Sequence, residues 1–550
     1  MTFDQLANPP FNLDGDGIAW VKERFLSLSG EDRLRQLFNL ILFGSDPDNV
    51  ERLKAFRPGG VTRFGGADAA TERALIASLN IDLPTPLLVS ADLEGSRLAL
   101  SGAAEMPNPL GLAALDGVEA TAEVSRIMAE EARAAGINWS FTPVLDINAA
   151  FRSPIVATRG FGSDVAVIER HAITQMEVFQ KNGIASAVKH WPGEGFDDRD
   201  QHLLTTVNPL GMEEWENTFG RLYRRAIEAG ALSVMSGHIA LPSFVRSITP
   251  EAGIEAFRPA SISHLLNVEL LRKRLGFNGL IVSDATPMAG LGSWSKRSEH
   301  LPELISSGCD VILFSDDCDT DLSYLKAALS DGRLSEGRVD EALIRQLGLK
   351  AALGLHRPQQ QETTVATERN KAYADAVLRR IPTLVKDVCG TLPLDPRKHR
   401  RVLVFSGDIV VPFWPGPQQF MLPELLKGHG FEVTIHTPEM VVDPEDFDLL
   451  LYLLGDETLL TRGRIFLDWL KLTGNFGNAM WRGWHDVPTV MISFGYPYLL
   501  YDAPRVPTYI NAYSTTETMQ RAVVDALLGE APWNRNNPVD PFCGLGDARF

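Results

Sequence analysis

Cysteine is scarce in this 550-residue sequence, and its four residues are far apart: Cys309, Cys318, Cys389 and Cys543. They form no CxxC pair, which argues against a disulfide framework and a zinc site and favours a reducing compartment. Residues 1–13 lack the basic start and apolar stretch of a signal peptide, and no apolar run approaches the length of a membrane span. We therefore expect a cytoplasmic protein with no membrane partner.

An excess of basic residues is also missing, since the formal net charge is −18. This charge argues against nucleic acid as the main partner, because the phosphate backbone selects basic surfaces. No His-x-His pattern or clustered ligand set indicates a metal site, and no cofactor is implied. The chain is too long for one ordinary core, so two domains or one very large barrel are expected.

Short β-prone runs alternate with amphipathic helical stretches over the first two thirds of the chain. Eight such runs are predicted as strands: Leu40–Phe43, Gly60–Phe64, Pro86–Ala91, Ile137–Pro143, Ser186–Trp191, Leu232–Ser236, Leu280–Ser283 and Val311–Phe314. The helical stretches between them include Glu119–Ala135, Val167–Asn182, Glu213–Ala229 and Ser261–Leu275. Near-continuous apolar strands are buried on both faces, so this pattern favours a parallel TIM-like (β/α)8 barrel, with an open doubly wound sheet as the alternative.

Ionisable residues stand where six of these strands end. They are Asp92 and Glu94, Asp146, Lys189 and His190, His238, Asp284, and Asp316 with Asp317. The carboxyl ends of barrel strands surround one mouth, so these groups should converge although they are distant in sequence. A single Asp in this position is usually a turn former or a helix cap.

The loop from Lys189 to His202 is the most unusual stretch of the chain. Pro192, Gly193 and Gly195 exclude a regular helix or strand there, because proline restricts φ and glycine permits positive φ. The same loop combines cationic side chains, imidazoles and carboxylates. Catalytic groups are often carried by loops on rigid scaffolds, so we expect part of an active site here.

A second, smaller doubly wound α/β domain is predicted beyond the barrel. We place the barrel at residues 1–356, a linker with a connecting helix at 357–395, and the second domain at 396–550. The predicted elements are a connecting helix at Thr367–Arg380, strands at Arg401–Phe405, Phe431–His436, Leu449–Leu454 and Val490–Phe494, and helices at Met421–Gly428, Leu460–Leu472 and Thr515–Leu528. This alternation of strands and helices is typical of an open α/β sheet.

Several motifs resemble glycoside hydrolase family 3, and within it the β-N-acetylhexosaminidase branch. They run Ala91-Asp92-Leu93-Glu94-Gly95, Phe141-Thr142-Pro143-Val144-Leu145-Asp146, Arg159-Gly160-Phe161-Gly162, the Lys189–His202 loop, Ser236-Gly237-His238 and Ser283-Asp284. The resemblance covers nearly the whole length and extends to Ser493–Leu500 in the second domain.

The resemblance implies a retaining glycosidase that acts on a carbohydrate substrate, for example a cell-wall fragment. Asp284 matches the nucleophile, and Asp200 with His202 matches the acid/base pair. Positions expected to bind the terminal sugar are Asp92, Arg159, Lys189, His190 and His238. A structural ion pair between Arg159 and Asp164 is the alternative for that arginine, and Asp146 is expected to satisfy backbone amides.

The chain departs from the family pattern at three positions. Leu100 replaces an arginine of the branch, Ser96 replaces a glycine, and Glu194 replaces a histidine near the sugar. Catalytic class should survive these changes, whereas the identity of the sugar stays open. The alternatives are another β-glycosidase of the family, a phosphorylase or transglycosylase, a silent sugar-binding protein and a metal-dependent barrel hydrolase. The oligomeric state also stays open.

Overall fold

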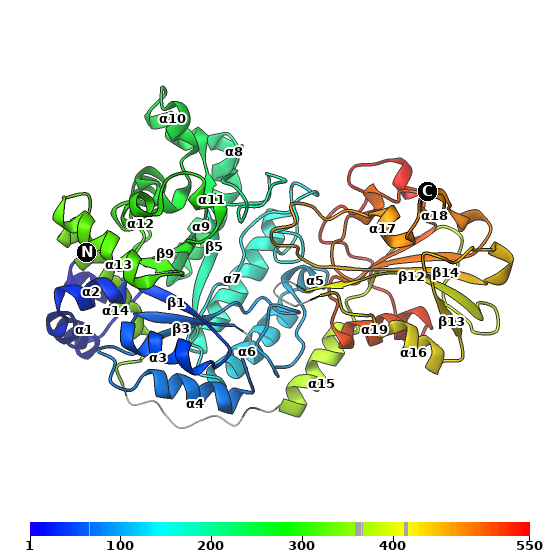
Figure 1. Cartoon of the computed structure of the whole chain (residues 1–550), viewed down its shortest axis with the longest axis horizontal. Helices are drawn as coiled ribbons and strands as arrows, with labels where there is room; N and C mark the ends of the chain where they lie inside the picture. Colours follow the sequence, from blue (N-terminus) through cyan, green and yellow to red (C-terminus); the bar gives the residue numbers. More distant parts are fainter. Residues whose placement is uncertain (65, 358–364, 366, 412–415) are drawn as a thin grey trace.

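The computed structural model describes residues 1–64, 66–357, 365, 367–411 and 416–550. Figure 1 shows two α/β units side by side, the first from blue to green and the second from yellow to red. Part of the predicted linker, residues 358–364 and 366, lies outside the described residues. None of the described helices combines the length and the apolar composition that a membrane crossing requires.

A closed barrel of parallel strands forms the first unit. Its order is β1-β10-β9-β7-β5-β4-β3-β2, so the barrel prediction is confirmed and the open-sheet alternative is wrong. The strands are β1 (Phe38–Phe43), β2 (Gly60–Phe64), β3 (Leu88–Ala91), β4 (Trp139–Ser140), β5 (Ala185–Trp191), β7 (Ser233–Ser236), β9 (Leu280–Ala285) and β10 (Val311–Leu313). Each of the eight predicted runs overlaps an observed strand.

Helices surround the barrel strands and fill the connections between them. They are α1 (Gly15–Ser27), α2 (Gly30–Gln36), α3 (Pro47–Phe56), α4 (Ala69–Leu79), α5 (Pro109–Ala113), α6 (Glu119–Ala134), α7 (Val165–Lys181), α8 (Met212–Asn217), α9 (Phe219–Glu228), α10 (Pro242–Ile248), η4 (Leu265–Arg274), α11 (Ala289–Gly292), α12 (Arg297–Ser306), α13 (Cys318–Ser330) and α14 (Glu336–Ala352). The helix predicted over Glu213–Ala229 is divided into α8 and α9, because Thr218 takes non-helical angles of φ −114° and ψ −95°.

Side-chain alternation along the strands determines which residues face the barrel interior. In β9, Leu280 and Val282 belong to the cluster that fills the barrel interior, while Ile281 packs into the outer core. The next residue on the interior side is Asp284 at the strand end. Ala185 and Ala187 of β5 alternate in the same way, which places Lys189 at the same mouth.

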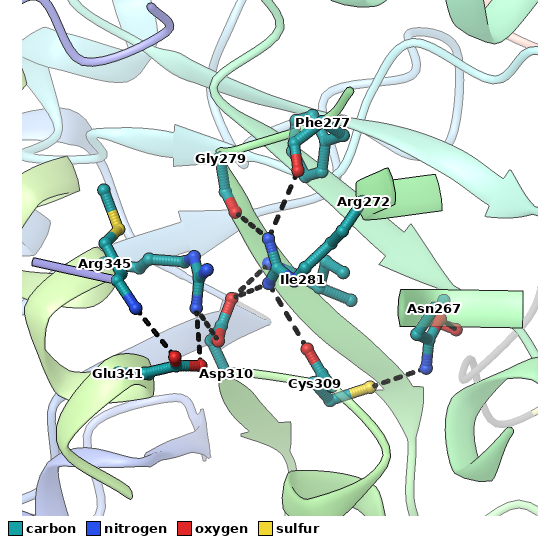
Figure 2. A network of polar contacts seen from close by, with 12 residues as sticks. Asn267, Arg272, Phe277, Gly279, Ile281, Cys309, Asp310, Glu341 and Arg345 are labelled. Atoms are coloured by element: carbon teal, nitrogen blue, oxygen red, sulfur yellow. Dashed lines mark hydrogen bonds and ion pairs between the residues drawn. The ribbon is translucent and has the colours of Figure 1, made fainter. Parts of the chain in front are cut away.

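A buried ion cluster closes the opposite end of the barrel. Asp310, at the start of β10, lies 2.6 Å from both Arg272 of η4 and Arg338 of α14. Its carboxylate also accepts a hydrogen bond from the backbone N–H of Ile281 in β9. Figure 2 shows how Asp310 connects β9, η4 and α14 around this point, with Glu341 beside Arg345. The cluster lies at the amino-terminal strand ends, so it is structural.

The second unit contains a six-stranded sheet of order β11-β16-β15-β14-β12-β13. Its strands are β11 (Thr383–Asp387), β12 (Arg401–Val410), β13 (Glu432–Ile435), β14 (Leu449–Asp456), β15 (Thr489–Ser493) and β16 (Thr508–Asn511). Among these described strands, only β11 is antiparallel to its neighbour. Its helices are α16 (Leu422–Gly428), α17 (Trp469–Thr473), α18 (Phe476–Met480) and α19 (Glu517–Leu527), and α15 (Thr367–Leu378) lies between the units. Figure 1 shows α16 and α19 below the sheet and α17 and α18 above it, as expected for an α/β sandwich.

Two local predictions for this unit differ from the structure. Strand β16 was not predicted, and the helix predicted over Leu460–Leu472 is wrong except for α17. Residues 461 and 463 take positive φ values of 63° and 75°, which an α-helix cannot contain. Strand β11 lies inside the predicted linker range and already joins the second sheet, while the boundaries at 356 and 395 stay predictions.

Candidate active site

Asp284 lies at the carboxyl end of β9, inside the barrel mouth, and is 8% exposed. Its Oδ1 accepts a hydrogen bond of 2.8 Å from the N–H of Ala285. Burial alone would raise the pKa of this carboxyl, but the electrostatic influence of the nearby His190, His238 and His202 outweighs it and lowers the pKa. Asp284 is therefore an anionic carboxylate at neutral pH that faces three imidazoles.

Asp200 and His202 form a closed hydrogen-bonded pair. The ring Nδ1 of His202 donates to Asp200 Oδ1 at 2.7 Å, and the backbone N–H of His202 donates to the same oxygen at 2.8 Å. The Asp200 side chain is fully buried, whereas that of His202 is 22% exposed. Burial opposes ionisation of Asp200, but its hydrogen bond to His202 lowers its pKa. With Nδ1 committed to Asp200, Nε2 of His202 is available for proton transfer.

The end of β5 contributes two residues because the strand bulges there. Its register against β7 shifts between Val188 and Trp191, and such shifts change the direction of side chains. His190 Nδ1 donates to Asp146 Oδ2 at 2.6 Å, while Asp146 Oδ1 accepts the backbone N–H groups of His190 and Glu194. Asp146 thus satisfies backbone amides, as expected, and also orients the His190 ring.

Two cations and two carboxylates meet beside β3. Glu94 binds Arg159 through two hydrogen bonds of 2.8 and 3.0 Å and lies 2.7 Å from Lys189. Lys189 Nζ also donates to Asp92 at 3.2 Å. The alternative pairing of Arg159 with Asp164 is wrong, because Asp164 caps the start of α7. Despite burial, the charges of Arg159 and Lys189 keep the pKa of Glu94 well below its usual value. The sequence analysis assigned no role to Glu94. The structure shows that it pairs with two buried cations, Arg159 and Lys189.

Glu194 is 3% exposed and belongs to the loop after β5, where its backbone N–H donates to Asp146. Burial and the charge of Asp146 raise its pKa well above the usual value. Its Oε2 accepts a hydrogen bond of 3.0 Å from Gln201, a residue that sequence reasoning passed over although it separates Asp200 from His202. Gln201 Oε1 also accepts the backbone N–H of His238, so this amide side chain connects the loop after β5 to the end of β7.

Asp146, His190 and Glu194 bring one ligand-type atom each within 4.8 Å of one another. The hydrogen bond of 2.6 Å between His190 and Asp146 accounts for the shortest of these spacings. Burial and the charge of Asp146 raise the pKa of Glu194, which disfavours the ionised carboxylate that binds a cation best. The chemistry of the three groups therefore agrees with a hydrogen-bonded cluster.

His238 is fully buried behind the nucleophile candidate. Its Nε2 donates to the carbonyl of Ala285 at 3.0 Å and its Nδ1 accepts from Ser261 Oγ at 2.8 Å. Burial lowers the pKa of His238, which agrees with a neutral ring holding the backbone next to Asp284. By contrast, Asp317 caps α13 and Asp316 is exposed, so these two strand-end residues act as turn and cap residues outside the buried cluster.

Comparisons with known proteins agree with this geometry. Residues 31–349 match the model of the glycosyl hydrolase family 3 N terminal domain. A beta-N-acetylglucosaminidase/beta-glucosidase of Cellulomonas fimi is 39% identical over 99% of this chain and 100% of the relative. A beta-hexosaminidase of Methylobacillus flagellatus is 28% identical, and the match covers 48% of this chain and 76% of that protein.

Solved structures show the same architecture over the whole length. The beta-glucoside phosphorylase BglX superposes with a TM-score of 0.91 at 32% identity, over 100% of both chains. A family 3 beta-N-acetylglucosaminidase from Paenibacillus, 23% identical, shares the fold with a TM-score of 0.79 and 94% of this chain covered. With a barrel whose mouth carries these carboxylates and imidazoles, the chain belongs to glycoside hydrolase family 3.

Proposed function

We propose that this protein is a retaining exo-β-glycosidase that removes terminal β-linked N-acetylglucosamine through a covalent glycosyl-enzyme. The observation that carries the proposal is the pairing of an anionic Asp284 with a separate Asp200–His202 hydrogen-bonded couple at one barrel mouth. The name of the Cellulomonas fimi relative supports both N-acetylglucosaminide and glucoside substrates. The finer choice of sugar rests on the motifs of the hexosaminidase branch.

Asp284 is suited to attack the anomeric carbon. A nucleophile must be ionised before the reaction, and the lowered pKa of Asp284 meets this condition at neutral pH. The backbone directly after Asp284 is held by the hydrogen bond from His238 to Ala285 O. His238 then positions the nucleophile from behind, which refines its expected role as a pocket residue.

His202 is suited to act twice in the reaction. In the first step its imidazolium protonates the leaving oxygen, and in the second step the neutral ring removes a proton from the acceptor. Asp200 stabilises the imidazolium and keeps Nε2 directed away from the pair. The partial exposure of His202 gives the acceptor access to that nitrogen, whereas Asp200 is closed off.

We place the sugar ring between opposite strands of the barrel. In the closed strand order, β3 lies four positions from β9 in either direction, so the strand ends that carry Asp92 and Asp284 lie on opposite sides of the mouth. A sugar whose anomeric carbon lies at Asp284 then extends toward Asp92, Lys189 and Arg159. Their charged groups suit hydroxyls, which both donate and accept hydrogen bonds. His190, oriented by Asp146, completes the proposed binding set.

Leu100 lines a cavity beside the proposed sugar site, which shares Asp92 with that site. A cavity of about 700 Å³ is lined by Asp92, Leu100, Phe43 and Phe64, among other residues. An arginine at position 100 would place a cation in this cavity, where the present chain has an apolar side chain. We infer that Leu100 relaxes recognition of the sugar edge farthest from Asp284. The buried Glu194 does not line this cavity; it accepts a hydrogen bond from Gln201, so we expect it to influence the sugar site through the loop after β5.

Phosphorolysis is a second candidate, favoured by two observations. The structurally similar BglX protein is named a beta-glucoside phosphorylase. In addition, a neutral imidazole repels an anionic acceptor less than a carboxylate base would. The reaction would transfer the glycosyl group from Asp284 to phosphate instead of water. Incubation with inorganic phosphate and an aryl glycoside distinguishes the two, because only phosphorolysis yields a glycosyl 1-phosphate.

A leaving-group experiment tests the acid/base assignment. His202→Ala should lower turnover of alkyl glycosides by about 10²–10⁴-fold, the usual contribution of acid–base catalysis. Formation of the glycosyl-enzyme from a dinitrophenyl glycoside should suffer far less, because that leaving group departs without protonation. Azide should restore turnover of the activated substrate and give a β-glycosyl azide. If Glu194→Ala shows this rescue and His202→Ala does not, the pair is wrongly assigned.

A further inference from the structure

One segment of the second domain reaches over the barrel mouth. Residues 457–462, which we name the bridge segment, follow β14 directly. Glu457 Oε1 accepts a hydrogen bond of 2.9 Å from Ser96 in the loop after β3. Leu459 N–H donates to Pro154 O in the loop after β4 at 3.4 Å. Thr461 N–H donates to Asp200 Oδ2 in the loop after β5 at 2.9 Å. The bridge segment therefore contacts three neighbouring barrel loops.

The bridge segment is firmly held at its base. The buried Glu457 carboxylate also accepts hydrogen bonds from Thr515, from its N–H at 2.7 Å and from its Oγ1 at 2.6 Å. At the other end, Thr461 takes a positive φ of 63°, and its Oγ1 donates to Leu460 O. A backbone fixed in this way presents the Thr461 N–H in one direction.

The hydrogen bond from Thr461 means that both carboxylate oxygens of Asp200 accept a hydrogen bond. Oδ1 of Asp200 receives both hydrogen bonds from His202, and Oδ2 receives the one from Thr461. A carboxylate held through a single oxygen can still rotate about its last side-chain bond. A donor on the other oxygen removes that freedom, and with it the freedom of the His202 ring to turn.

We propose that the second domain is a positioning element for the acid/base pair, acting through the backbone N–H of Thr461. The inference rests on the proposed function, since it concerns the pair assigned there. Thr461 touches no reacting atom and works through Asp200. The domain contact itself does not depend on this one bond, because Arg97 binds Thr515 and Asn108 binds Tyr513 elsewhere in the interface.

The sharpest test removes the N–H donor of Thr461 while keeping its side chain. Replacing Thr461 by its α-hydroxy acid turns the amide into an ester, which retains the side chain but lacks the donor. Thr461→Pro is a simpler version that also changes φ. Thr461→Ala is the matched control, because it retains the N–H and loses only the hydroxyl contact to Leu460. Asn108→Ala is a second control that weakens the domain interface away from Asp200.

We expect the ester to lower kcat/KM for an alkyl glycoside by about ten- to a hundredfold, the equivalent of one hydrogen bond to a charged group. Glycosyl-enzyme formation from a dinitrophenyl glycoside should stay unchanged, and Thr461→Ala and Asn108→Ala should show no such dependence on the leaving group. An equal loss on both substrates, or no loss, would overturn the inference.

The outcome is separable from that of the proposed function. If His202→Ala shows the leaving-group dependence and the ester does not, only the positioning role fails. If neither variant shows it, the acid/base assignment fails first. Should Thr461→Pro fail to fold, the ester still decides, because it keeps the backbone geometry.

Discussion

Lys350 on α14 offers a quantitative test of how burial affects this barrel. Its Nζ is fully buried and contacts two neutral groups, Thr85 Oγ1 at 2.7 Å and Gln36 Oε1 at 3.2 Å. Burial lowers the pKa of Lys350 from 10.5 to about 7. The protonated amine is therefore destabilised in the folded protein relative to the unfolded chain.

The size and the pH range of this cost follow from that shift. Each pKa unit corresponds to about 1.36 kcal/mol, so the folded state loses about 5 kcal/mol when the amine is protonated in both states, below about pH 7. Between about pH 7 and 10.5 the unfolded chain binds more protons than the folded one, so stability rises with pH. Near pH 10 the remaining cost is about 1 kcal/mol.

The effect of Lys350→Met on the free energy of unfolding should accordingly change sign with pH. The substitution removes the cost of burying the charge and also two hydrogen bonds worth about 1 kcal/mol each. Thr85 and Gln36 stay satisfied because Thr85 Oγ1 donates to Gln36 Oε1 at 2.5 Å. The free energy of unfolding should therefore rise by about 3 kcal/mol at pH 6 and fall by about 1 kcal/mol at pH 10.

Urea unfolding at pH 6 and pH 10 measures this difference, with the exposed Lys181→Met as the matched control. Hydrogen exchange of the α14 amides reports the stability of the barrel separately from that of the second domain. If Lys350→Met destabilises the protein equally at both pH values, burial of the charged amine does not control the stability at this position, and the reasoning is refuted.

Other expectations concern catalysis and stability. Asp284→Ala should abolish turnover without changing the urea midpoint, and activity above about a hundredth of wild type would contradict the nucleophile assignment. Leu100→Arg combined with Glu194→His should raise kcat/KM for N-acetylglucosaminides relative to glucosides; an unchanged ratio would mean that neither position controls the sugar. Asp310→Asn should lower the free energy of unfolding by about 3–5 kcal/mol because it leaves buried arginines without their anion. Asp331→Asn, which breaks the exposed pair with Arg333, should leave the urea midpoint nearly unchanged and serves as its control.

Predictions from local sequence succeeded where a strand or loop is specified by its own residues. Every barrel strand was found because buried parallel strands require continuous apolar runs. The loop after β5 was recognised from its proline and glycines, and both Gly193 and Gly195 take positive φ. A Cβ at Gly195 would lie 1.9 Å from Ile147 O, so glycine is required there by close packing as well.

Local patterns failed where a distant partner decides the conformation. The apolar spacing of residues 460–472 predicts a helix, but the bridge segment instead leaves the second sheet and hydrogen-bonds to barrel loops. Arg159 pairs with Glu94, which is 65 positions away, and not with the nearby Asp164. Such choices depend on which groups the fold brings together, and sequence spacing does not contain that information.

The sequence by itself determined the barrel, the loop after β5 and the candidate nucleophile, because periodicity, turn residues and family motifs are local properties. Tertiary structure alone decided that Asp200 is held from both domains, that Glu94 holds Arg159 and Lys189 together, and that Glu194 is buried. The physical reason is that hydrogen bonds and pKa values depend on burial and on neighbours in space. Both arise only when strand ends that are distant in the chain meet at one mouth.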